Sequence, residues 1–179
     1  VRLHESATGF LATAPKTIDG CIVTDVRMPG IDGIEFLRQL RTRGHTVPVI
    51  VMTGHADVAL AVQAMKEGAA DFIEKPFDDQ VLIDAIRSAL DNRNLAVATH
   101  PQAAEIRNCL STLSERERQV LDGLVSGLPN KSIAYDLGIS PRTVEVYKAR
   151  IMDKLQVDRL PDLIRIALDL ELSLKRDAS

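Results

Sequence analysis

Short apolar runs alternate with helix-like segments in the first half of the chain. The runs at residues 21–24, 49–52 and 71–74 have the length and composition of buried strands. The segments at residues 33–43 and 58–67 lie between them and carry apolar residues at helical spacing, and each ends at a glycine. Strands that alternate with helices predict an α/β fold with a doubly wound parallel sheet.

Two further elements are expected to flank this pattern. Residues 1–4 are predicted to form a short strand, and residues 6–14 a short helix with Phe10 and Leu11 facing inward. After the third run, a helix is predicted over residues 79–92. Its apolar stripe is predicted to consist of Val81, Ile83, Ile86 and Leu90.

From Leu113 onward the pattern is helical throughout. Ser114 is followed three residues later by Glu117, which is the signature of a capping box at the start of a helix. A short helix over residues 131–137 and a longer one after Ser140 are joined by a turn that contains Gly138. Two helices joined in this way predict a helix-turn-helix within an all-α, four-helix domain.

The longer helix presents two different faces. One face is apolar and should pack inward; it carries Val144, Tyr147, Ile151 and Leu155. The other face combines small side chains with flanking cations, which suits entry into the major groove of DNA. The residues predicted to contact DNA are Arg142, Thr143, Glu145, Val146, Lys148, Ala149 and Arg150. The alternative from periodicity is a solvated surface helix.

Three polar residues follow the ends of the three predicted strands. Asp25, Thr53 and Lys75 each stand at or just after a strand, and parallel strands bring such ends to one edge of a sheet. A carboxylate there can attack a phosphoryl group, while a hydroxyl and an ammonium hold the oxygens that it acquires. Each residue by itself is more often a cap or turn residue, but their order and spacing favour a shared site.

The residues around these three positions resemble a known family. Thr24 to Pro29, Thr53 to His55 and Glu74 to Phe77 are similar to the receiver domain of two-component response regulators of the FixJ/NarL type, a flavodoxin-like fold. The resemblance implies that Asp25 is the phosphoacceptor, that Thr53 and Phe72 are switch residues, and that Lys75 forms a salt bridge. It also implies Mg²⁺ as a cofactor, bound by Asp25, by the backbone carbonyl of Arg27 and by an acidic pair on a preceding strand.

That acidic pair has no counterpart in this sequence. Glu5 and Asp19 are the acids before Asp25, and neither follows an apolar strand that leads into a helix. One carboxylate and a loop carbonyl make a poor Mg²⁺ site, since the ion prefers octahedral oxygen ligation. Two explanations remain open: the sequence is a fragment of a receiver truncated at its N-terminus, or the receiver is degenerate.

The second half resembles the LuxR-type DNA-binding domain. The similarity covers about residues 113–172 and includes the motifs that begin at Leu113, Asn130, Ile139 and Ile151. The resemblance implies a last helix that supports dimerisation. The partners that it implies are double-stranded promoter DNA, a sensor histidine kinase, RNA polymerase and a second copy of the chain.

Composition and charge limit which kinds of site and partner are possible. Cys21 and Cys109 are far apart, which gives no support to a disulfide or zinc site. From Ser111 onward acidic and basic residues are equal in number, so the net charge of −3 arises in the first part and DNA contact depends on local clustering. No apolar stretch approaches the roughly 20 residues that span a bilayer, and the chain is expected to be cytoplasmic.

The combined interpretation is a DNA-binding response regulator that is not an enzyme. The receiver domain is placed at residues 1–95, a linker at 96–110 and the DNA-binding domain at 111–179. One alternative is a phosphorylation-independent DNA-binding regulator with a degenerate receiver. An aspartyl phosphatase is disfavoured, because the position two after Asp25 is Arg27 and not a second acid.

Overall fold

The computed structural model describes residues 1–54, 58–95 and 108–177. The chain folds into two compact units, one built around a β-sheet and the other from helices. Each unit is described by itself below. Among the described residues, no helix is long and apolar enough to cross a membrane.

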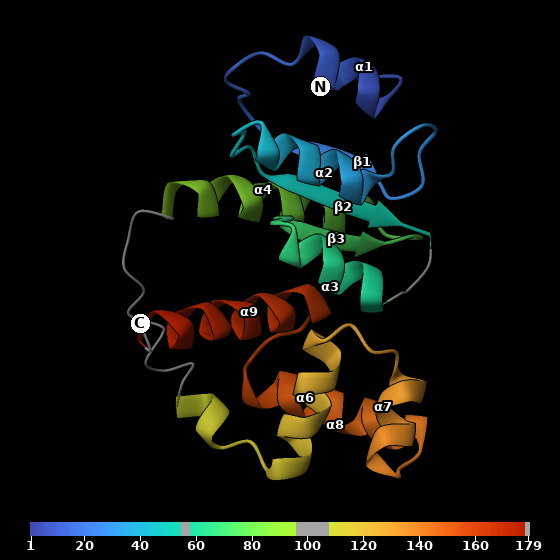
Figure 1. The fold of residues 1–179 in the computed structure, drawn as a ribbon, viewed down its shortest axis with the longest axis vertical. Helices are drawn as coiled ribbons and strands as arrows, with labels where there is room; N and C mark the ends of the chain where they lie inside the picture. The colour runs from blue at the N-terminus through green and yellow to red at the C-terminus, as the bar shows by residue number, and fades with distance from the viewer. Residues whose placement is uncertain (55–57, 96–107, 178–179) are drawn as a thin grey trace. The chain divides into compact units, whose positions relative to one another are not determined.

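The first unit contains a parallel sheet of three strands. They are β1 (Ile22–Asp25), β2 (Val49–Thr53) and β3 (Asp71–Glu74), with β2 in the centre (Figure 1). In the register, Asp25 pairs with Met52, and Thr53 pairs with Glu74. The three carboxyl ends therefore meet at one edge, as the sequence predicted for an α/β receiver fold.

Four helices alternate with these strands along the chain, and local sequence explains where two of them start. The Ser6 hydroxyl accepts from the backbone N–H of Gly9, and the Asp32 carboxylate accepts from the first N–H groups of the next helix, so both residues act as N-caps. The helices are α1 (Ala7–Thr13), α2 (Gly33–Thr42), α3 (Val58–Lys66) and α4 (Asp79–Leu95).

Part of the core lies between the sheet and α4. Ile50 and Ile73 pack against Ala85 and Ala89. Along β2, successive side chains point to opposite faces, so Val49 and Val51, which are fully buried, lie on the face away from this cluster. The sheet is therefore covered on both sides, which explains why the sequences of its strands are continuous apolar runs.

The predicted apolar stripe of α4 was partly wrong. Val81 is 37% exposed and Ile83 is 40% exposed, whereas the small residues Ala85 and Ala89 face the sheet. The spacing of Leu82, Ala85 and Ala89 follows one face of a helix. The small alanine side chains allow this face to approach β2 and β3 closely.

The predicted strand at residues 1–4 was also wrong. These residues adopt no regular structure, and Val1 and Leu3 are fully exposed. The ring of His4 instead contacts Phe10 edge-on, with ring centroids 4.8 Å apart. A strand requires a hydrogen-bonded neighbour, and no described strand pairs with this segment.

The second unit is entirely helical where it is described. Its named helices are α6 (Glu115–Val125), α7 (Asn130–Leu137), α8 (Pro141–Lys154) and α9 (Leu160–Asp177), and residues 108–111 add a helical turn before them. The largest fully buried side chains of this unit are Val120, Leu124, Ile133, Val144, Ile151, Leu163 and Ile164. The predicted four-helix domain is confirmed.

The helix boundaries of the second unit follow the predicted caps. Ser114 and Glu117 form a complete capping box, and the Ser140 hydroxyl accepts from the N–H of Thr143. Gly138 ends α7 with a φ of 64°, a left-handed conformation that favours glycine. The turn between α7 and α8 is therefore specified locally. The predicted linker at residues 96–110 lies mostly outside the described residues, and the domain boundaries remain a prediction.

Candidate functional site

Asp25 lies at the carboxyl end of β1 and contacts the residue after β3. Its Oδ2 accepts a hydrogen bond from the ammonium of Lys75, which is 50 residues away in sequence. Its Oδ1 accepts from the backbone N–H of Arg27 at 3.0 Å. The side chains of Asp25 and Lys75 are 31% and 40% exposed, so the pair is held by the fold and yet open to solvent.

These contacts alter the ionisation of Asp25. Partial burial by itself raises the pKa of the carboxyl group, but the hydrogen bonds from Lys75 and from the backbone outweigh that effect, so the pKa lies below its ordinary value. Asp25 is therefore anionic near neutral pH. An anionic, partly exposed carboxylate is the form in which this group can act as a nucleophile.

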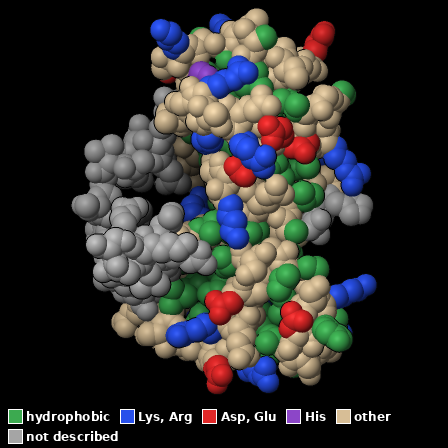
Figure 2. Space-filling model, in the orientation of Figure 1, with side chains coloured by type: hydrophobic (Ala, Val, Ile, Leu, Met, Phe, Trp, Pro, Cys, Tyr) green, Lys and Arg blue, Asp and Glu red, His purple; other side chains and the backbone are tan. Residues whose placement is uncertain are grey.

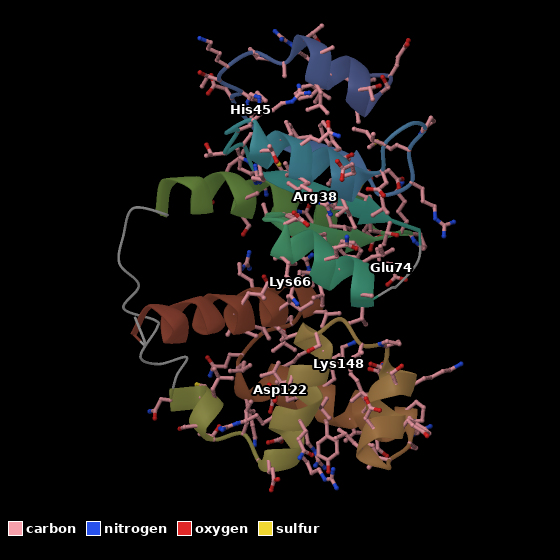
Figure 3. All side chains as sticks on the ribbon, viewed as in Figure 1. Arg38, His45, Lys66, Glu74, Asp122 and Lys148 are labelled. Atoms are coloured by element: carbon pink, nitrogen blue, oxygen red, sulfur yellow. The ribbon has the colours of Figure 1, made fainter. Side chains whose placement is uncertain are left out.

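Thr53 and Phe72 lie on the strands beside this pair. Thr53 ends β2 and its side chain is 2% exposed, while its carbonyl accepts from the N–H of Lys75 at 2.7 Å. Phe72 lies in β3 and is 7% exposed. The structure therefore brings Asp25 and Lys75 into contact and places Thr53 on the strand between them. Glu74, labelled in Figure 3, marks the end of β3 directly before Lys75.

Gly33 supports this edge of the sheet and was not singled out from the sequence. A Cβ at this position would lie 2.3 Å from the carbonyl oxygen of Asp25, and the Gly33 N–H donates to the carbonyl of Val26 at 2.9 Å. The start of α2 is thus in close contact with the end of β1. The signal in the sequence was weak, since a glycine directly after Asp32 is also expected near a helix cap.

The residues that the structure describes do not make up a complete Mg²⁺ site. No group of three or more His, Cys, Asp or Glu residues among them is arranged to hold a metal ion. The Asp25 carboxylate is already hydrogen-bonded to Lys75, and the carbonyl of Arg27 is the second predicted ligand. These two ligands would leave most of the octahedral oxygen shell of Mg²⁺ to water, and the predicted acidic pair is not among the described residues.

Helix α8 presents the face that the sequence predicted. Val144 and Ile151 are fully buried and Leu155 is 8% exposed, so this side packs into the domain. On the other side Val146 is 45% exposed, unusually open for a β-branched apolar residue. The other exposed members of this face are Arg142, Glu145, Ala149 and Arg150, with Thr143 and Lys148 half-buried. Their predicted contact with DNA stays a prediction.

Two of the charged contacts of α8 lie within the helix itself. Nζ of Lys148, labelled in Figure 3, lies 3.7 Å from Oε2 of Glu145, and the guanidinium of Arg150 lies 5.9 Å from the ring centroid of Tyr147. Acidic and basic side chains are interspersed on the face drawn in Figure 2. DNA contact would therefore depend on these individual groups.

Comparison with known families assigns both halves of the chain. The model of the response regulator receiver domain matches residues 1–113, and that of the bacterial regulatory proteins of the luxR family matches residues 111–167. The chain therefore combines a receiver with a LuxR-type DNA-binding domain.

Curated relatives match the chain over most of their length. The chain is 56% identical to the transcriptional regulatory protein FixJ of Rhizobium meliloti over 94% of this chain and 82% of the relative. It is 55% identical to FixJ of Azorhizobium caulinodans, over 94% and 80%. The crystal structure of full-length FixJ from B. japonicum is similar, with a TM-score of 0.51 at 48% identity, covering 94% of this chain and 83% of that one.

These matches define the class of protein. The chain is a transcriptional response regulator, in which a receiver precedes a DNA-binding domain. It belongs to the FixJ/NarL-type family of response regulators.

Proposed function

We propose that phosphorylation of Asp25 by a sensor histidine kinase promotes dimerisation and the binding of α8 to promoter DNA. The contact between Asp25 and Lys75 is the observation that carries the proposal. It joins an anionic nucleophile to a cation at the sheet edge where the three strands end. RNA polymerase is a further expected partner at the promoter.

The transfer step follows from these groups. An Asp25 oxygen attacks the phosphorus of a phosphohistidine on the kinase, an O–P bond forms, and the P–N bond breaks. The imidazole leaves and takes up a proton from solvent. Lys75 then donates to a phosphoryl oxygen in place of the carboxylate, since the added charge attracts the nearest ammonium.

The proposed switch acts through neighbouring residues. Thr53 would move toward the phosphoryl oxygens, and the surface that involves α3, β3 and α4 would repack and pair with a second copy. Val81 and Ile83 support this surface, because exposed aliphatic side chains on α4 gain from burial in an interface. The Phe72 side chain is already buried in this structure, so an inward turn would have to begin from another rotamer.

A second candidate function keeps the DNA interface but dispenses with phosphorylation. Receivers of this family generally use Mg²⁺ for phosphorylation, and the described residues do not make up its site. In the second candidate, α8 binds DNA without phosphorylation and the sheet unit is structural. The two candidates share the DNA interface and differ in their response to a phosphodonor.

Intact-mass measurement after incubation with acetyl phosphate and Mg²⁺ separates the two. The wild-type chain should gain one phosphoryl group, Asp25→Asn should gain none, and the matched control Asp19→Asn, at an exposed loop carboxylate, should behave as wild type. Light scattering on the same samples should show a dimer only where the adduct forms. An adduct on Asp25→Asn, or none on the wild type, would overturn the phosphoacceptor assignment.

A further inference from the structure

A hydrogen bond links the two helices of the helix-turn-helix at the proposed DNA interface. The side-chain amide of Asn130, at the start of α7, donates to Oε1 of Glu145 on α8. The other carboxylate oxygen, Oε2, lies 3.7 Å from the ammonium of Lys148. The Glu145 carboxylate is thus held from two sides, although its side chain is 55% exposed. Exposed glutamates ordinarily sample several rotamers, so this restraint calls for an explanation.

The Asn130 side chain is itself under an unusual constraint. Its Oδ1 is buried and has no hydrogen-bond partner within the described part of the chain. An enclosed, unsatisfied oxygen is unfavourable, and such groups are rare in folded proteins. Rotating the amide would not relieve the problem, because Oδ1 would then face the carboxylate of Glu145. The position of Glu145 therefore fixes the amide with its donor toward α8.

Glu145 retains acceptor capacity after these contacts. An ionised carboxylate has about four lone-pair sites, and Asn130 and Lys148 use part of this capacity. In the major groove, a carboxylate accepts from the N4 amine of cytosine. Adenine also offers an amine, but its adjacent N7 acceptor repels a carboxylate, as do the acceptors of guanine. Lys148 reduces the repulsion between Glu145 and nearby phosphates.

We infer that Glu145 is a specificity-determining residue that selects a cytosine, and that Asn130 is the positioning residue that holds its carboxylate for this contact. The inference rests on the proposed function, since it assumes that α8 enters the major groove. Ordering the side chain before binding lowers the entropic cost of the base contact. Without Asn130, Glu145 keeps its charge and exposure but loses its fixed direction.

Selection from a randomised double-stranded DNA library tests both statements. The full chain, Asn130→Ala, Glu145→Gln and the control Lys131→Ala would each be used, and the enriched sequences compared position by position. The wild type should enrich cytosine at one position of each half-site. Asn130→Ala should lower that preference about tenfold, and Glu145→Gln should shift it toward adenine, which glutamine reads through N6 and N7. Lys131→Ala should weaken binding to all sequences without changing the preference.

The preference is a ratio within one protein sample, so partial loss of folded protein in a variant does not change it. An enriched motif that is identical for the wild type, Asn130→Ala and Glu145→Gln would overturn the inference and leave the proposed function intact. A cytosine preference that Glu145→Gln removes and Asn130→Ala preserves would overturn the positioning role. No enrichment by the wild type would overturn the DNA-binding proposal together with the inference.

Discussion

Lys154 and Glu117 form an ion pair that joins the end of α8 to the start of α6, with Nζ 2.7 Å from Oε2. Glu117 is 4% exposed, and its Oε2 also accepts from the N–H of Ser114 at 2.7 Å. Lys154 donates in addition to the carbonyl of Thr112 at 3.1 Å. The capping box of α6 therefore has a second purpose, because it presents its carboxylate to the helix proposed to bind DNA.

The pair should stabilise the second unit in a pH-dependent way. The hydrogen bond from Lys154, followed by that from Ser114, holds the pKa of Glu117 below its ordinary 4.5. A lowered folded-state pKa contributes stability that is present above the unfolded value and is lost as the pH falls through the folded one. The variant Lys154→Met should therefore lower the free energy of unfolding by about 1–2 kcal/mol near pH 7, and by much less in acid.

Tyrosine fluorescence can follow the unfolding of the second unit and so measure this loss of stability. Both tyrosines of the chain, Tyr135 and Tyr147, lie in that unit. Urea unfolding would be compared for the wild type, Lys154→Met and Lys131→Met, the last of which removes an exposed lysine from α7. An equal loss of stability at both pH values would show that the ion pair is not its cause.

Lys75 should control the ionisation of Asp25. The variant Lys75→Met removes the strongest of the hydrogen bonds that together outweigh partial burial, so the pKa of Asp25 should rise from its lowered value. Titration of the Asp25 carboxyl carbon by NMR measures this directly. The control Lys66→Met removes an exposed lysine in the last turn of α3 and should leave the titration unchanged. An unchanged pKa in Lys75→Met would contradict the contact.

Gly33→Ala should destabilise the sheet unit by about 1–3 kcal/mol. The added Cβ would lie 2.3 Å from the Asp25 carbonyl oxygen, so the start of α2 or the end of β1 must move. Gly54→Ala is the matched control, because nothing lies within 4 Å of a Cβ there. Chemical denaturation followed by circular dichroism would compare the two variants. Equal stability in both would mean that the close approach is readily relieved.

Arg142 and Arg150 should contribute to DNA binding mainly through phosphates. Replacing either with alanine should weaken binding to all DNA sequences about tenfold at low salt. It should also reduce the slope of log affinity against log salt concentration by about one. Arg116→Ala is the control, because Arg116 lies on α6 and donates to Gln119. Fluorescence anisotropy over a range of salt concentrations gives both quantities. Unchanged affinity and slope in both variants would place the interface elsewhere.

Much of the fold could be predicted from local sequence. The three parallel strands, the capping box at Ser114 and the left-handed turn at Gly138 appear where the patterns indicated. The side chains of α8 divide into buried and exposed faces as its periodicity predicted. Such features depend on hydrogen bonds and burial within a few residues, so the sequence contains the necessary information.

The errors arose where a neighbouring element decides the outcome. Residues 1–4 alternate like a strand but have no described partner strand. In α4 the bulkier Val81 and Ile83 were taken for the core, whereas the close approach of the sheet selected Ala85 and Ala89. Helix α4 also continues beyond its predicted end at residue 92, to Leu95, because no residue near the expected end forces a stop.

The sequence by itself determined the elements of this protein, their caps and the family to which it belongs. The tertiary structure decided which distant side chains meet: Asp25 with Lys75, Glu117 with Lys154, and Asn130 with Glu145. These partners are between 15 and 50 residues apart. Their contacts depend on strand register and helix packing, which are set by the burial of the whole core rather than by the residues that meet.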